Sequence, residues 1–293
     1  MHQSTSEKAL YGWLLLLPAA ILLFTFTYYP MAGTLFDSLV AEGRGSIASR
    51  FVGLANYRML LEDQVFKTVL LNNLLFALGT IPASIGLALA MALMVDRSFT
   101  GRGLVRMAFF TPTILPMIAV ANIWLFFYTP DIGLIDSLLS LIGIDGPNWL
   151  GTPSTVLPAI IVMAIWKEAG FFMIFYLAAL QTISPEFKEA ARIEGAGGWY
   201  YFRRVLFPLL MPTTLFISVN AVINSFKLVD HLFVLTKGGP DNASNLLLYY
   251  IYETAFSYFD AGYAASLTAV LLLILTTLAL VQFFVFDRRI HYR

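Results

Sequence analysis

The sequence contains no cysteine and only three histidines, which lie far apart at His2, His231 and His291. The absence of cysteine excludes a disulfide framework, thiol catalysis and thiolate metal sites. The scattered histidines form no ligand cluster, so the sequence predicts no metal site and argues against a metalloenzyme.

Charge is also scarce, because charged residues make up only 12% of the 293 residues. The 18 Lys and Arg residues balance 18 Asp and Glu residues, which gives a formal net charge of zero. Nucleic-acid binding requires a basic excess that neutralises the phosphate backbone. A nucleic acid is therefore not an expected partner.

Apolar residues are abundant, at 59% of the chain, and the mean hydropathy is +0.76. Soluble domains are close to half apolar and about a quarter charged, so this composition predicts a membrane protein. A helix needs roughly 20 apolar residues to cross the hydrocarbon core. Six stretches meet this requirement: Ala9–Met31, Thr68–Val95, Met107–Pro130, Thr155–Gln181, Val205–Phe226 and Ala261–Phe286. We therefore predict an all-α polytopic protein with six transmembrane helices.

Two of these spans need comment. The first begins after only eight residues, but its apolar run is longer than that of a secretory signal and no small-x-small cleavage site follows it. We expect it to be retained as a helix. The fourth is interrupted by Lys167 and Glu168, which makes it the least certain span and the most informative one.

The distribution of Lys and Arg predicts the orientation, because cytoplasmic loops are enriched in these residues. Eleven of them fall on one side of the predicted topology: Lys8, Arg97, Arg102, Arg106, Lys188, Arg192, Arg203, Arg204, Arg288, Arg289 and Arg293. The opposite loops carry only five and hold most of the acids. Both termini are therefore expected in the cytoplasm, with residues 1–8 and 287–293 flanking a transmembrane domain over 9–286. The outer loops are too short for a separate catalytic domain.

The inner loop over residues 184–204 lies between the fourth and fifth spans. Its sequence has the start and stop signals of a short helix, a turn and a second helix. Ser184 is placed to cap the first helix, and Pro185 suits its first position. Gly195 supplies a stop at its C-terminal end. Phe187, Ile193 and Phe202 would provide apolar contacts. A short helix–turn–helix of this kind is suited to insertion into a groove on a partner protein.

This loop also carries a motif, Glu189-Ala-Ala-Arg-Ile-Glu-Gly-Ala196, followed by Pro208-Leu-Leu-Met-Pro212. The motif resembles the coupling loop of binding-protein-dependent ABC importer permeases, whose pattern is Glu-Ala-Ala-x-x-Asp-Gly-Ala with a later Leu-Pro-x-x-x-Pro. Glu194 replaces the usual Asp, and Phe207 replaces a common Leu; both changes are mild. Other matches are Phe51–Tyr57, Asn148–Leu150, Trp166 and Gly238–Pro240, of which the last is similar to the first permease subunit of the maltose/glycerol-phosphate branch.

The resemblance implies a division of labour. A homologous second permease completes the pathway, an extracytoplasmic solute-binding protein delivers a sugar or polyol, and two ATP-binding cassette subunits clamp the coupling helices. The sequence contains no G-x-x-x-x-G-K-[ST] phosphate loop, so ATP and Mg²⁺ are expected on those partners, with no cofactor on this chain and no catalytic residues. The residues implied in coupling are Glu189, Ala190, Ala191, Gly195 and Ala196. The expected location is the bacterial inner membrane, in contact with lipid.

Polar residues at membrane depth are the candidates for the substrate pathway, because burying them in lipid is unfavourable unless they have a partner. Lys167 and Glu168 point about 100° apart on a helix, so each could pair with another helix instead of lining the pathway. Lys227, Asp230 and His231 would share a helical face, and a local ion pair is the favoured interpretation.

Uncharged polar residues extend this set. Asn224 and Ser225, with Asn220 upstream and Asn122 in the third span, could exchange hydrogen bonds with hydroxyl groups, or could join helices to one another instead. Trp166 could stack on a sugar ring, although packing is favoured. Asn72 and Asn73 are expected at the membrane interface. Prolines at 82, 112, 116, 158, 208 and 212 could bend helices, but the sequence does not distinguish which of them do so.

Two alternatives remain open. A secondary transporter or channel working alone would leave the 184–204 loop unexplained and often shows internal repeats, none of which is clear. A membrane-embedded enzyme would need clustered histidines or carboxylates. The substrate also stays open: glycerol phosphate would favour Lys167 or Lys227 as ligands, whereas a neutral saccharide would favour the Asn, Ser and aromatic set.

Overall fold

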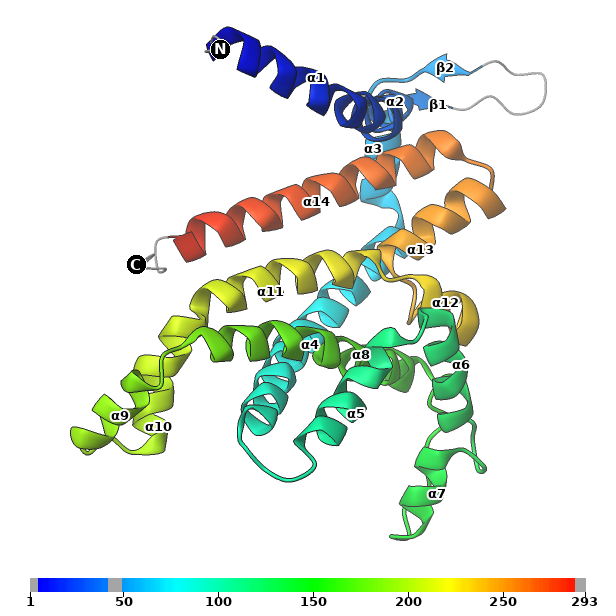
Figure 1. Ribbon diagram of the computed structural model, residues 1–293. Coiled ribbons are helices and arrows are strands. Elements are labelled where there is room, and N and C mark those ends of the chain that lie inside the picture. Colours follow the sequence, from blue (N-terminus) through cyan, green and yellow to red (C-terminus); the bar gives the residue numbers. More distant parts are fainter. Residues whose placement is uncertain (1–4, 42–48, 288–293) are drawn as a thin grey trace. The chain divides into compact units, whose positions relative to one another are not determined.

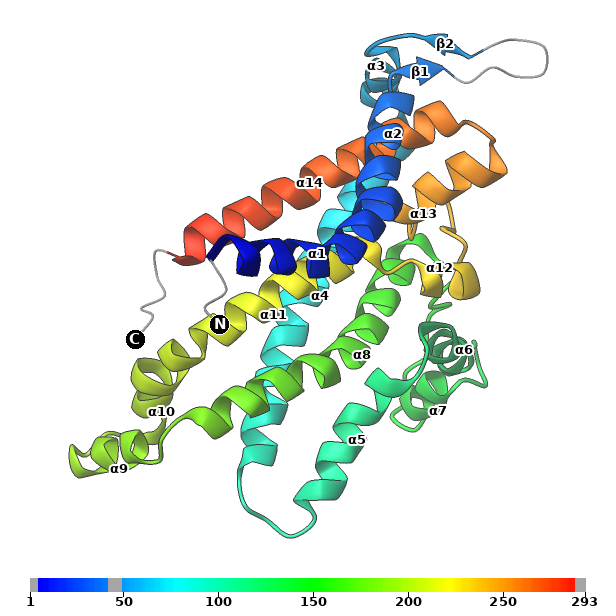
Figure 2. The ribbon, with the colours of Figure 1, turned by 45° about the horizontal axis from the view of Figure 1, so that its top comes forward.

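The computed structural model describes residues 5–41 and 49–287, which are almost entirely helical (Figures 1 and 2). The chain divides into two compact units. We call residues 1–63 with 251–272 the terminal unit, and residues 64–250 with 273–293 the central unit. Residues 1–4 and 288–293 of the predicted cytoplasmic termini, which include His2 and His291, lie outside the described residues.

The terminal unit contains the first predicted span and the loop that follows it. Its elements are α1 (Thr5–Leu23), the π-helical turn η1 (Phe24–Tyr28), α2 (Tyr29–Asp37), β1 (Val40–Ala41), β2 (Arg50–Phe51), α3 (Ala55–Glu62) and η3 (Glu253–Ser257). β1 and β2 pair antiparallel. The Asn56 amide donates to the carbonyls of Ser38 (2.9 Å) and Val40 (3.0 Å), so this motif residue ties α3 to the end of α2.

The central unit contains the other helices. They are α4 (Gln64–Asp96), α5 (Arg102–Ile114), α6 (Met117–Phe127), α7 (Leu134–Ser140), α8 (Pro153–Thr182), α9 (Glu186–Ile193), α10 (Gly198–Tyr201), the π-helical turn η2 (Phe202–Leu206), α11 (Phe207–Lys227) and α12 (Asp230–Leu235). α13 (Leu247–Tyr252) and α14 (Ala261–Asp287) cross the boundary between the units.

The predicted spans correspond closely to these helices. Within the described residues, five helices are long and apolar enough to cross a bilayer, and the number is six if a sharply bent pair counts as one span. The second span is α4, the fourth is α8 and the sixth is α14. The prediction of an all-α polytopic fold is confirmed, apart from the two-residue strands.

The third predicted span, Met107–Pro130, is wrong as a single helix. α5 ends at Ile114, α6 begins at Met117, and the two helices are bent by 103° relative to each other. Pro116 disfavours helical geometry at the preceding residue, and Leu115 is accordingly extended, with ψ 136°. Pro82, Pro112, Pro158 and Pro212 stay inside continuous helices, so among these prolines only Pro116 marks a break.

The helix of the fifth predicted span ends too early for Lys227, Asp230 and His231 to share the one helical face that the sequence predicted. α11 stops at Lys227, Leu228 is extended, and a new helix starts at Asp230. Lys227, Asp230 and His231 therefore do not share one helical face, and no ion pair joins them in the part of the chain that the structure describes. The predicted local ion pair is wrong, because the helix breaks between its members.

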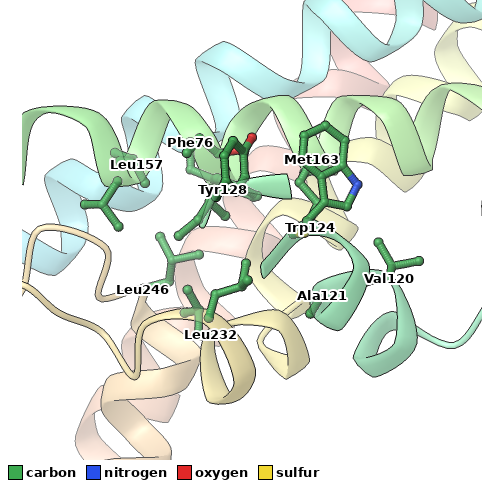
Figure 3. Packing of buried hydrophobic residues seen from close by; sticks show 14 of the residues in the cluster. Phe76, Val120, Ala121, Trp124, Tyr128, Leu157, Met163, Leu232 and Leu246 are labelled. Atoms are coloured by element: carbon green, nitrogen blue, oxygen red, sulfur yellow. The ribbon is translucent and has the colours of Figure 1, made fainter. Parts of the chain in front are cut away.

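Two buried apolar clusters form the core of the central unit. The first joins α6 and the N-terminal half of α8 to α12, with Val120, Ile160 and Leu232 fully buried (Figure 3). The second joins the C-terminal halves of α4 and α8 to α11, with Ala92 and Leu210 fully buried. Along α8 the first cluster extends to Ala164 and the second begins at Ala169, so the residues between them lie at the junction of the two clusters.

Candidate functional site

A polar layer occupies this junction. Its members are Lys167 and Glu168 on α8, Thr80 and Ser84 on α4, and Asn224 and Ser225 on α11. All of them except Lys167 line one small pocket, together with Phe76 and Ala164. The sequence-predicted pathway residues of α8 and α11 therefore meet at one level of the central unit.

Lys167 and Glu168 each bind a different helix. The Lys167 ammonium group donates to the carbonyls of Leu115 (Nζ to O 2.7 Å) and Pro112 (3.2 Å) at the break between α5 and α6. Glu168 accepts a hydrogen bond at Oε2 from the amide of Asn224 on α11, at 2.8 Å. As the helical geometry predicts, the two neighbours point apart and do not pair with each other.

The remaining pathway candidates divide by exposure. Asn122 is exposed, Asn220 is half-buried, and each amide group donates to the carbonyl four residues earlier in its own helix, at 2.8 Å. Trp166 is 37% exposed and packs edge-to-face on Trp124, with ring centroids 5.7 Å apart. Ser225 is only 3% exposed, and its hydroxyl donates to the Val222 carbonyl. Their contact with substrate stays a prediction.

The three residues at the end of α11 have different surroundings. Lys227 and Asp230 are exposed, whereas His231 is fully buried in α12 and its ring stacks on Phe76. Neither nitrogen of His231 has a hydrogen-bond partner among the described residues. No group of three or more His, Asp or Glu residues that could hold a metal ion occurs in the described part of the chain.

The loop over residues 184–204 forms the helix–turn–helix that its sequence predicts. α9 and α10 project from the ends of α8 and α11 (Figures 1 and 2). Gly195 has φ +73°, and the amide of Ala196 donates to the carbonyl of Ala191 at 2.8 Å, which is the Schellman pattern of a helix end. At the other end α9 starts one residue later than predicted, so Pro185 is its N-cap, and the Ser184 hydroxyl accepts the Glu186 amide at 3.4 Å.

This loop presents exposed apolar side chains and an exposed carboxylate. Phe187 is 48% exposed, Ile193 87% and Trp199 72%, whereas Ala191 is buried. The Glu189 carboxylate is exposed and has no hydrogen-bond partner within the described residues. Behind α9, a cavity of about 790 Å³ separates the loop from the ends of α4 and α8.

Sequence reasoning missed two buried amides. Asn72 and Asn73 are only 7% and 2% exposed, so both side chains are buried within the protein, while their position at the membrane interface stays a prediction. Asn72 donates to the carbonyls of Asn242 (2.7 Å) and Asn245 (3.0 Å), and Asn73 accepts the amide of Leu247 at 2.6 Å. The two Asn side chains bond to backbone groups of residues 242–247, which are distant in sequence. No local sequence pattern around residues 72 and 73 indicates these partners.

Residues 84–292 match the profile of the family described as "Binding-protein-dependent transport system inner membrane component". The chain belongs to this family. The permease is thus a multi-pass membrane protein and a transmembrane subunit of an ABC importer, as the coupling-loop motif predicts.

Relatives of the permease support the assignment over nearly its whole length. It is 32% identical to the sn-glycerol-3-phosphate transport system permease protein UgpA of Agrobacterium fabrum, which covers 96% of both chains. It is 34% identical to the lactose transport system permease protein LacF of Rhizobium radiobacter, over 93% of both chains. It is 31% identical to the trehalose/maltose transport system permease protein MalF of Thermococcus litoralis, over 87% of this chain and 85% of that one.

The fold of the permease is also found in a solved structure. A chain of a bacterial ABC transporter involved in the import of the acidic polysaccharide alginate superposes with a TM-score of 0.84 at 23% identity, over 96% of both chains. A second structure of the bacterial alginate ABC transporter, in complex with a periplasmic protein bound to an alginate pentasaccharide, gives a TM-score of 0.83.

Proposed function

We propose that the permease forms one half of the translocation pathway of an ATP-driven importer for a carbohydrate or polyol, and that the 184–204 loop couples it to separate ATPase subunits. The exposed, capped helix α9 carries this proposal. A connection between spans needs neither this length nor a helix that ends in a Schellman turn. Its apolar side chains, Phe187 and Ile193, have no cover within the loop.

The orientation follows from charge. The loop that contains α9 carries Lys188, Arg192, Arg203 and Arg204, which places it on the cytoplasmic side by the positive-inside rule. Both termini then lie on the same side. This arrangement puts α9 where cytoplasmic ATPase subunits can bind it, and leaves the loops at the opposite end for a solute-binding protein.

The partners of the permease are inferred from this arrangement. Two ATP-binding cassette subunits would supply ATP hydrolysis with Mg²⁺, because the permease has no phosphate loop. A homologous permease would complete the pathway. The chain itself would perform no covalent chemistry, and its role would be to alternate between outward-facing and inward-facing states.

The substrate class rests on the polar side chains at membrane depth. Lys167 already donates to two backbone carbonyls, which leaves only one N–H of its ammonium group for an anion. Amide groups remain at Asn122 and Asn220, and they suit the hydroxyl groups of a neutral sugar or polyol. Because Lys227 is exposed, a phosphorylated polyol such as glycerol phosphate is the second candidate.

A crosslinking experiment tests the coupling role directly. The chain contains no cysteine, so an Ala190→Cys variant carries a single reactive thiol on the exposed face of α9. In the assembled importer we expect a short bifunctional reagent to join this position to an ATPase subunit. Leu138→Cys, on α7 before the opposite end of α8, is the matched control and should not crosslink to the ATPase. Equal crosslinking at both positions, or none at Ala190→Cys, would contradict the proposal.

A further inference from the structure

The break in the third span leaves backbone groups that a membrane environment does not tolerate. In a continuous helix the amide of residue 116 would donate to the carbonyl of Pro112, but Pro116 has no N–H group. Leu115 is extended, so its carbonyl points out of the helical pattern as well. Lipid supplies no hydrogen-bond donor, so each such carbonyl needs a donor from the protein.

Lys167 supplies that donor from another helix. Its ammonium group contacts the carbonyls of Pro112 and Leu115, at 3.2 and 2.7 Å. The Pro112 carbonyl lacks its helical donor because Pro116 has no N–H, and the Leu115 carbonyl belongs to the extended residue at the break. The contact with the Leu115 carbonyl is specific to the bent geometry, because a straight helix would use that carbonyl internally.

The backbones of α5 and α8 also approach closely beside this contact. A Cβ atom on Gly170 would lie 2.2 Å from the carbonyl oxygen of Phe109, so only glycine fits there. The hydroxyl of Thr113 donates to the Lys167 carbonyl at 3.4 Å. Below the break, α5 is thus held against α8 at three points.

Above the break, α6 belongs to a different packing group. Its buried side chains, Val120, Ala121 and Trp124, pack in the first apolar cluster with α12, as Figure 3 shows. α5 instead borders the second cluster through Val105, Phe109 and Phe110. Lys167 therefore lies where one predicted span passes from one cluster to the other.

We propose that Lys167 is a positioning residue that holds the third span in its bent form, so that α5 stays attached to α8 while α6 is directed toward α12. This role of Lys167 is distinct from substrate binding. Its expected effect on the transport rate rests on the proposed transport function. A ligand of the substrate would set KM, whereas a residue that holds the bend sets the rate at which the pathway changes state.

A distance measurement tests the geometry without any transport assay. Spin labels at Leu104→Cys on α5 and Phe126→Cys on α6, both exposed positions, report the bend in the assembled importer after cysteines of the other subunits are replaced. With a rise of 1.5 Å per residue and a bend of 103°, the backbone separation is about 21 Å, against about 33 Å for a straight helix. A single distance near the longer value in the otherwise unmodified chain would overturn the proposal.

Substitutions test the role of Lys167. In Lys167→Met we expect the short distance to broaden toward longer values and the maximal transport rate to fall about tenfold or more, with KM within twofold. Lys167→Arg, which can still donate to both carbonyls, should restore the short distance and most of the rate. Lys67→Met, an exposed lysine on α4, is the matched control and should change neither. An unchanged distance in Lys167→Met, or a loss expressed mainly in KM, would contradict the proposal.

A double substitution keeps the test informative if Lys167→Met assembles poorly. Pro116→Ala restores the N–H group that bonds the Pro112 carbonyl in a continuous helix. We expect Pro116→Ala to recover assembly of Lys167→Met while shifting the label distance toward the longer value. Recovery of assembly with the short distance retained would show that the bend does not depend on Lys167 and would refute the proposal. Transport failure with the expected distances would instead count against the proposed function alone.

Discussion

Buried amide side chains join distant segments of the central unit. Asn73 accepts a hydrogen bond from the amide of Leu247 at 2.6 Å and donates to the carbonyl of Ser225 at 3.3 Å. One side chain on α4 thereby holds both the start of α13 and the end of α11. A backbone amide without a partner is unfavourable in such an interior, so this residue is required for stability.

Replacing Asn73 with leucine should destabilise the protein by about 1–3 kcal/mol, the usual effect of leaving a buried donor unpaired. Asn122→Leu is the control, because its amide bonds only to the carbonyl of Ile118 in its own helix. Thermal unfolding of the purified importer in one detergent should show a clear fall in Tm for Asn73→Leu and little change for Asn122→Leu. Equal shifts would mean that the hydrogen bonds of Asn73 contribute nothing specific.

Two neighbouring polar residues on α11 should differ in their effect on the substrate. Asn220 is half-buried, whereas Ser225 is 3% exposed and bonded within its helix. If Asn220 binds substrate, Asn220→Ala removes a hydrogen bond of about 0.5–1.5 kcal/mol, which raises KM about 2- to 10-fold. Ser225→Ala should leave KM unchanged. Uptake kinetics measure both values, and the reverse order would disprove this assignment.

At the scale of elements, the end of α9 depends on one residue in the left-handed region. Gly195 has φ +73°, and a Cβ atom there would meet no other atom within 4 Å. A substitution is therefore strained by its backbone conformation and not by a steric clash. This separation permits a test of the turn itself.

Gly195→Val should weaken coupling, because a residue with a Cβ atom loses about 1–2 kcal/mol in this conformation and a β-branched one loses more. That energy corresponds to about a 5- to 30-fold change in the population of the correct turn. Gly195→Asn is the matched variant, since Asn tolerates this conformation. We expect ATP hydrolysis stimulated by the loaded solute-binding protein to fall in the valine variant and to persist in the asparagine variant. Stimulation at the normal level in both would argue against a role for the turn.

The elements differed in how far the sequence could predict them. Apolar length alone located α4, α8 and α14, because lipid demands continuous helices. The Gly195 turn was predicted because its determinants are local. The break at Pro116 was not assigned, since five other prolines gave the same local signal and the donor that makes the break tolerable, Lys167, lies on another helix. Asn73 was missed for the same reason.

At the scale of the whole molecule, the balance of charge has a spatial meaning. The formal net charge is zero, but Lys and Arg residues gather on the side of the 184–204 loop, and acids gather on the opposite side. The positive-inside rule then predicts that the 184–204 loop and both termini lie in the cytoplasm. In the proposed importer, this orientation would decide which surface meets the ATPase subunits and which meets the solute-binding protein.

Single cysteines at exposed positions can check this orientation, because the chain has none of its own. In spheroplasts, a membrane-impermeant maleimide should label Asp241→Cys, in the loop after α12. The same reagent should label Trp199→Cys, in the 184–204 loop, only after the membrane is opened. Labelling of Trp199→Cys in sealed spheroplasts would reverse the topology and place the loop away from ATP.

We propose that the permease works only as part of an ATP-driven importer, and reconstituted uptake tests this dependence most directly. Proteoliposomes should contain the permease, its second permease subunit and the two ATPase subunits, with the solute-binding protein on one face and ATP on the other. We predict sugar or polyol uptake that requires ATP, the binding protein and every subunit. Uptake by the permease alone, driven by an ion gradient without ATP, would contradict the account.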